Sequence, residues 1–251
     1  MANTEYFTKA YRDAQITRTL ATLEKIRGRS SVPAGRVIPD ADDLPIHAGR
    51  RLDATVLFLD ISKFSQRPAW TEGEQDTLLR ILSLFFTEMI RIIEDFGGVV
   101  EKNTGDGLMA YFVAEPGDTI SVQQRALAAA LTMFYAADNY INPILRSSQL
   151  EPLQFRICMD HGPITVAKVG SARGFNGIVA IGTTANIASK MLAAADPNTI
   201  LMGTKALVGL PTSWQTTWAR PKTSETGWFY RGDSSPYTFW TYVGRWLEPT
   251  T

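Results

Sequence analysis

The sequence is poor in several features that would direct function. Cys158 is the only cysteine in 251 residues, which excludes an intrachain disulfide and a zinc site built from cysteines. It lies in the apolar run FRICMD, where a small buried hydrophobic residue is expected rather than a nucleophile. No uninterrupted apolar stretch approaches the length of a membrane span, and the polar N-terminus contains no signal-peptide core. We therefore expect a cytoplasmic protein without membrane insertion.

The sequence also lacks a surplus of charge. Lys plus Arg and Asp plus Glu number 25 each, so no global field attracts nucleic acid or an anionic membrane. We therefore expect no nucleic acid binding, and an anionic ligand must be held by a local cluster. The composition, 45% hydrophobic and 20% charged, is that of a soluble globular protein.

The chain divides into an extension and one main domain. Residues 4–28 place apolar and charged groups at helical spacing, which predicts an amphipathic helix outside the main domain. Residues 29–50 contain three prolines and two glycines and are typical of an irregular linker. We assign residues 1–50 to an N-terminal helix and linker arm, and residues 51–251 to the main domain.

The main domain alternates strand and helix patterns. The expected elements are a central strand at 54–61, a helix after it, a hairpin at 97–112, a helix at 119–142, strands at 153–160 and 163–169, a helix at 182–195 and a strand at 199–203. The tail from residue 212 onward is rich in aromatics and Thr, which favours strands. This order predicts an α+β sandwich on the ferredoxin-like split βαβ plan. Helices would cover one face of its sheet and leave the other for a partner.

Two aspartates stand where this plan brings strands together. Asp60 closes the apolar strand ATVLFLDI, and Asp106 lies in the Gly-Asp-Gly turn of the hairpin. An aspartate at such a turn is by itself an ordinary turn former, and either residue alone fits a solvated strand end. Together they would repel one another unless a divalent cation relieved the repulsion. All-oxygen ligands suit Mg²⁺ or Mn²⁺ shared with substrate phosphates.

Four segments give the chain a specific resemblance. VLFLDISKFS, EKNTGDGLMAYF and IGTTANIASKM, in this order, resemble signature segments of class III nucleotidyl cyclases. RICMDHGPITVAKVG resembles a fourth, with Asp160-His161-Gly162 where the family has His-Ser-Gly. The resemblance covers about residues 52–205 and makes 51–251 a cyclase catalytic domain.

The resemblance implies a reaction and its metal ligands. In this family the ribose 3′ oxygen attacks the α-phosphate of a nucleoside triphosphate, and pyrophosphate leaves. Two divalent cations assist, held here by Asp60, Asp106 and the Ile61 carbonyl. The backbone amides that open the turn at Ser62, Lys63 and Phe64 would receive the terminal phosphates.

Further residues match the family's substrate contacts. Asn186 and Lys190 lie i, i+4 on one predicted helix, at positions where the family has Asn for the ribose and Arg for the α-phosphate. Lys keeps the positive charge but not the planar fork of Arg. Arg173 and Arg231 are candidate triphosphate contacts, the alternative being solvated surface arginines.

The resemblance also implies a head-to-tail homodimer with two composite sites, because one chain carries one set of motifs. The metal aspartates of one subunit would then face the base- and ribose-binding groups of its partner.

Two positions bear on the base. Adenylyl cyclases of this class have Lys and Asp at the positions of Lys102 and Val179, and guanylyl cyclases have Glu at the first. Val179 cannot accept a hydrogen bond from an exocyclic amine, whereas a Lys ammonium can donate to the carbonyls of uracil. Lys102 paired with Glu101 or Asp106 is the alternative.

The chain resembles most the pyrimidine cyclases of bacterial Pycsar antiphage defence, which make cyclic UMP or cyclic CMP. The Lys102 donor favours UTP as the substrate and cyclic UMP as the product. CTP, ATP, and a catalytically inactive nucleotide-binding module remain as alternatives.

Overall fold

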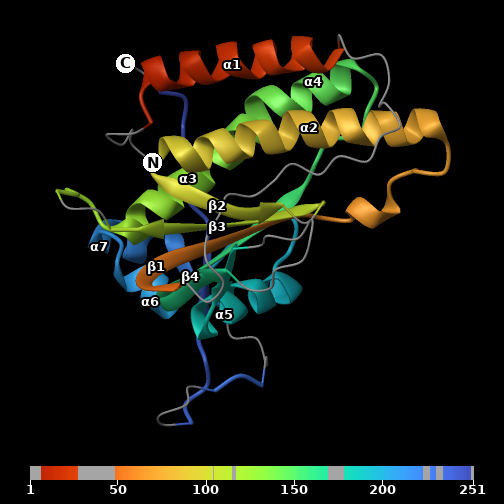
Figure 1. The fold of residues 1–251 in the computed structure, drawn as a ribbon. Helices are drawn as coiled ribbons and strands as arrows, with labels where there is room; N and C mark the ends of the chain where they lie inside the picture. The colour runs from red at the N-terminus through yellow and green to blue at the C-terminus, as the bar shows by residue number, and fades with distance from the viewer. Residues whose placement is uncertain are drawn as a thin grey trace.

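The computed structural model describes residues 7–27, 49–103, 105–114, 117–168, 178–222, 227–229 and 234–249. Within this part an eight-stranded sheet forms the centre of the protein (Figure 1). In spatial order its strands are β2 (Gly98–Asn103), β3 (Gly107–Val113), β1 (Gly49–Ile61), β4 (Phe155–Lys168), β6 (Ile200–Gly203), β8 (Phe239–Tyr242) and β7 (Ala219–Lys222), and β5 (Ile178–Ile181) also pairs with β4. The β4–β6 pairing is parallel and the others are antiparallel. The order β2-β3-β1-β4 is that of the split βαβ plan, so the predicted α+β class is confirmed.

Helices lie on both sides of this sheet. They are α1 (Lys9–Arg27), α2 (Glu72–Asp95), α3 (Val122–Ala136), α4 (Asn142–Ser147), α5 (Thr183–Met191), α6 (Thr204–Val208) and α7 (Thr212–Trp218). Helices α2 and α3 cover one face, and α5 lies against the other (Figure 1). Helix α2 begins with a capping box, in which Thr71 accepts the amide of Glu74 at 3.2 Å and Glu74 accepts the amide of Thr71 at 2.9 Å.

Strand β1 is central because it is apolar on both faces, as its unbroken run of β-forming residues predicts. Leu57 and Leu59 are buried in the core cluster that includes α2 and α3. Val56 is buried in a second cluster, which includes Ala188 of α5. The sheet face expected to be left open for a partner is therefore partly covered by α5 of the same chain.

Strand β4 is one continuous strand, whereas we predicted two strands at 153–160 and 163–169. It stays paired with β1 across the expected break, with Gly162 opposite Ala54 and Pro163 opposite Asp53. Gly162 has φ 150°, a conformation that a residue without a Cβ adopts readily. The long partner strand and this glycine let the ladder continue where the local sequence suggested a turn.

Two helical segments also differ from expectation. The predicted helix at 119–142 is α3 followed by a π-helical turn, Ala137–Ile141, and then α4. The tail beyond residue 212 begins with helix α7 before the strands β7 and β8. Trp214 and Trp218 lie four residues apart on α7 and pack against the first core cluster, which is the spacing that favours a helix there.

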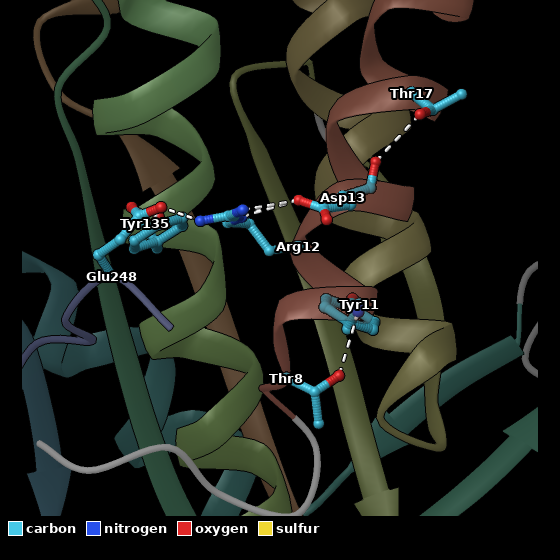
Figure 2. A network of polar contacts seen from close by, with 7 residues as sticks. All are labelled: Thr8, Tyr11, Arg12, Asp13, Thr17, Tyr135 and Glu248. Atoms are coloured by element: carbon cyan, nitrogen blue, oxygen red, sulfur yellow. Dashed lines mark hydrogen bonds and ion pairs between the residues drawn. The ribbon is translucent and has the colours of Figure 1, made fainter. Parts of the chain in front are cut away.

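Helix α1 is packed onto the main domain rather than lying outside it. Phe7, just before the helix, is fully buried and stacks on Trp246 with ring centroids 5.5 Å apart. Arg12 forms an ion pair with Glu248 of the C-terminal segment, and Glu248 also accepts a hydrogen bond from Tyr135 of α3 (Figure 2). The N-terminal segment and the C-terminal segment therefore contact each other, and both contact α3. The division of the chain at residue 50 stays a prediction.

The face that α1 turns toward α2 carries polar groups. Arg18 donates to the buried carboxylate of Glu88 on α2 at 3.1 Å and also pairs with Asp95. Gln15 and Thr19 are buried on the same helix, at 0% and 1% exposure. The contact between α1 and α2 therefore combines these ionic groups with apolar packing, in which Tyr11 and Leu23 lie against the first core cluster.

No helix in the described ranges is long and apolar enough to cross a membrane.

Candidate active site

The backbone brings the two proposed metal aspartates to one end of two neighbouring strands. Asp60 lies opposite Gly107 in the β1–β3 ladder, and the amide of Ile61 donates to the carbonyl of Asp106 at 2.8 Å. Gly105, at φ 99°, allows the tight turn that precedes Asp106. Asp60 and Asp106 are both half-buried at this edge. Residues 46 positions apart in the sequence thus become neighbours in space.

Arg156 of β4 is the direct partner of Asp60. It lies opposite Asp60 in the β1–β4 ladder, and its Nε and Nη2 donate to Asp60 Oδ2 at 2.9 and 2.8 Å. Its Nη1 donates to the carbonyl of Ala195 at 3.2 Å. Sequence reasoning missed this residue, although a single Arg in the apolar run FRICMD, facing a strand-end Asp, was a signal for it.

The donor set fits a hard divalent cation. The two carboxylates and the Ile61 carbonyl are all oxygen ligands, which suit Mg²⁺ or Mn²⁺. Both contacts from Arg156 go to Oδ2 of Asp60, so Oδ1 is available as a ligand. The described residues contain no group of three or more His, Cys, Asp and Glu that could hold a metal ion. A substrate triphosphate would supply further oxygens.

The turn after Asp60 differs in part from expectation. The amide of Ser62 donates to the carbonyl of Gln154 at 2.8 Å, so this amide is already bound and the expectation that it receives phosphate is wrong. Lys63 has φ 57°, which is uncommon for a residue with a side chain. A 3₁₀ turn, Phe64–Gln66, follows, and the Phe64 side chain packs against the core. The amides of Lys63 and Phe64 remain as the candidate phosphate donors.

Asn186 and Lys190 lie one turn apart on α5, and both are exposed. Ala185 and Ala188 of the same helix are buried against the sheet, which directs the other side of α5 outward. None of the contacts in the described part of the chain joins Asn186 or Lys190 to Asp60 or Asp106. Within one chain the structure therefore does not bring these two pairs together.

The positions proposed to read the base are described by their backbone. Lys102 lies opposite Met109 after a β-bulge in β2, and Val179 lies opposite Ala167 in β5. Arg173 and Arg231 lie outside the described residues. Sequence reasoning also missed Glu101, whose Oε2 accepts the amide of Ala180 at 2.8 Å.

Strand β4 also carries a buried acid, Asp160. It is 4% exposed, and burial raises the pKa of its carboxyl to about 6, while the neighbouring His161 amide and the Tyr237 side chain lower it. The ring of His161 contacts Thr55 at 3.0 Å and Asp53 at 3.4 Å, and burial lowers its pKa. Asp160 stands where the family motif has a histidine, so this departure places a carboxyl inside the fold.

Comparisons with known proteins agree with this architecture. The model of the family described as the adenylate and guanylate cyclase catalytic domain matches residues 46–231. A uridylate cyclase of Xanthomonas perforans is 31% identical over 170 residues, 65% of this chain and 70% of that protein. A uridylate cyclase of Rhodovulum sp. (strain MB263) is 25% identical over 63% of this chain and 65% of its own length.

Solved structures of the same fold include two cyclases. The guanylyl cyclase Cya2 superposes with a TM-score of 0.65 at 21% identity, covering 81% of this chain and 97% of that structure. The adenylyl cyclase CyaB of P. aeruginosa gives a TM-score of 0.61 at 23% identity, covering 78% and 96%. With a family match over most of its length and this fold, the chain belongs to the adenylate and guanylate cyclase catalytic domain family and is a nucleotidyl cyclase.

Proposed function

We propose that the protein is a uridylate cyclase, which converts UTP into 3′,5′-cyclic UMP and pyrophosphate. The observation that carries the catalytic part is the bond between the Ile61 amide and the Asp106 carbonyl, which sets the two aspartates side by side at the edge of β1 and β3. The choice of uracil is supported by the names of the relatives and by the absence of an acidic side chain at position 179.

Two divalent cations, Mg²⁺ or Mn²⁺, would be held by Asp60, Asp106 and the Ile61 carbonyl. When bound they would neutralise the phosphates and favour the ionised form of the ribose 3′ hydroxyl. Arg156 balances the charge of Asp60 before substrate arrives and is a further proposed contact for phosphate oxygens. The amides of Lys63 and Phe64, with Arg173 and Arg231, are the further proposed phosphate contacts.

The rest of the site is proposed to come from the partner subunit of a homodimer. Asn186 would hold the ribose, and Lys190 would stabilise the charge that develops on the α-phosphate. Both side chains are exposed on α5, where a second subunit can reach them. Lys102 and Val179 would line the base pocket in the same half-site.

The decisive experiment incubates the purified protein with Mn²⁺ and each of ATP, GTP, CTP and UTP. Cyclic UMP as the main product is expected, and the Asp60→Asn and Asp106→Asn variants should stay folded but make no product. Cyclic AMP or cyclic CMP as the dominant product would refute the choice of base. If the wild-type protein cyclises none of the four nucleotides, the proposal that it is an active cyclase is refuted. A catalytically inactive nucleotide-binding module would then be favoured, and the Lys at position 190 is the observation that supports it.

A mixing experiment tests the composite site. Asp106→Ala and Lys190→Ala should each be inactive alone. A mixture should recover up to about a quarter of the wild-type activity, because random pairing makes half of the dimers mixed and each mixed dimer holds one intact site of two. If the mixture stays inactive although the subunits exchange, the composite site is wrong.

A cellular role in antiphage defence, with cyclic UMP as the second messenger, completes the proposal. It is supported by the resemblance to standalone pyrimidine cyclases. A strain that carries the gene should restrict phage better than a strain with the Asp60→Asn variant, provided that the matching effector is present.

A further inference from the structure

One hydrogen bond links two parts of the proposed site that are not neighbours in the sheet. Glu101 lies on β2, at the edge of the sheet beyond β3, and its Oε2 accepts the amide of Ala180 on β5 at 2.8 Å. Strand β5 pairs with β4, so β3, β1 and β4 lie between β2 and β5 in the order of the sheet. The bond therefore spans across the face of the sheet rather than along it.

The surroundings of this bond are partly shielded from water. Ala180 is 9% exposed and belongs to the second core cluster, and Glu101 is half-buried. Burial raises the pKa of Tyr111 on the neighbouring strand, and the negative charge of Glu101 raises it further. A buried backbone amide needs an acceptor, and a carboxylate forms a stronger bond with it than a neutral group.

Both ends of the bond continue directly into the proposed site. From Glu101 the chain continues to Lys102, which is proposed to line the base pocket. From Ala180 the chain passes Gly182 and enters α5, which carries Asn186 and Lys190 of the same half-site. Strand β5 has only four residues and pairs with β4, so the bond to Glu101 adds an attachment to β2.

We propose that Glu101 is a positioning residue for nucleotide cyclisation: its carboxylate fixes β5, and through β5 the helix that carries Asn186 and Lys190, relative to β2, which carries Lys102 of the same half-site. Glu101 acts as a hydrogen-bond acceptor for the backbone and does not touch the substrate. This inference rests on the proposed function of Asn186 and Lys190, and it adds a residue that was not among the site residues expected from the sequence.

Two variants of the full-length protein separate this role from its alternatives. Glu101→Ala removes the acceptor, whereas Glu101→Gln keeps an oxygen that can accept the Ala180 amide but removes the charge. Glu94→Ala, at an exposed position near the end of α2, is the matched control. Amide hydrogen exchange of residues 178–181 is measured without nucleotide, and kcat and KM are measured with each nucleoside triphosphate.

For Glu101→Ala we expect exchange at residues 178–181 to rise, and kcat to fall, by about tenfold, the scale of one lost hydrogen bond to a charged acceptor. KM should change little, because no substrate contact is removed. Glu101→Gln should stay within about threefold of the wild type in both measurements, and Glu94→Ala should match the wild type.

Unchanged exchange in Glu101→Ala would overturn the proposal. So would a Glu101→Gln variant that keeps its amides protected but loses activity or changes its nucleotide preference, because the carboxylate would then act on the substrate through its charge. A wild-type protein without turnover would refute the proposed function instead. The exchange measurement would in that case still decide whether Glu101 fixes β5.

Discussion

Asp160 offers a test of how the fold tolerates a buried acid. Its side chain is 4% exposed, and burial raises the pKa of its carboxyl to about 6, above the value of 3.8 for the unfolded chain. At a pH between these values the folded protein holds more protons than the unfolded protein, so the free energy of unfolding falls as pH rises. Below about pH 4 the Asp160 carboxyl is protonated in both states and does not lower the free energy of unfolding. The stability that its raised pKa maintains is lost as pH rises through about 6.

The magnitude follows from the shift. A difference of about two pKa units, at about 1.4 kcal/mol each, corresponds to roughly 3 kcal/mol at neutral pH. Asp160→Asn replaces the carboxyl with a neutral group of the same shape. We expect this variant to be more stable than the wild type by up to about 3 kcal/mol at pH 7.5 and equally stable at pH 4.

The assay is urea-induced unfolding of both proteins at several pH values from 4 to 8. Asp76→Asn, at a half-buried position on α2, is the control and should leave the pH dependence unchanged. The reasoning is refuted if Asp160→Asn is no more stable than the wild type at pH 7.5, or if both proteins lose stability equally between pH 4 and 7.

Two further predictions concern helix α1. Phe7→Ala should lower the free energy of unfolding by about 3 kcal/mol or more, because it removes a fully buried ring from between Tyr135 and Trp246. The control Trp70→Ala, at a side chain that is 93% exposed, should lower it by less than about 0.5 kcal/mol. Equal losses for the two variants in thermal and urea unfolding would contradict the prediction. Glu88→Gln should destabilise the protein by about 1–3 kcal/mol, because Arg18 loses its buried charged acceptor on α2, and limited proteolysis should then cleave first within residues 9–27; a variant as stable and as resistant as the wild type would show that the pair does not hold α1.

Local patterns in the sequence were enough to predict the central elements and the places of Asp60 and Asp106 in the fold. The apolar run before Asp60 requires a strand buried on both faces, and Gly-Asp-Gly requires a tight turn, so both aspartates were placed by short-range rules. Strand β4 was predicted as two pieces because Gly162 and Pro163 indicate a turn locally. Only the long partner β1, which the local sequence does not reveal, keeps β4 continuous.

Arg156 and Glu101 escaped prediction for a related reason. Arg156 meets Asp60 across 96 residues through strand register, and a shift of one residue would have placed it on the opposite face. Glu101 meets Ala180 across 79 residues, between strands that are not neighbours in the sheet. Neither contact follows from periodicity or from a motif, because each depends on how the whole sheet is assembled.

The position of α5 sharpens the expectation for the dimer. We expected the second subunit to cover an open face of the sheet, but α5 already covers part of that face through Ala185 and Ala188. Asn186 and Lys190 lie on the outer side of the same helix. In the proposed composite site, the partner's Asp60 and Asp106 would therefore lie against the outer side of α5 rather than against the strands beneath it. This geometry predicts that a bulky substitution at the exposed Ser189, between Asn186 and Lys190, weakens activity by obstructing the partner while the stability of the single chain is unchanged. A Ser189→Trp variant with wild-type activity would place the partner elsewhere.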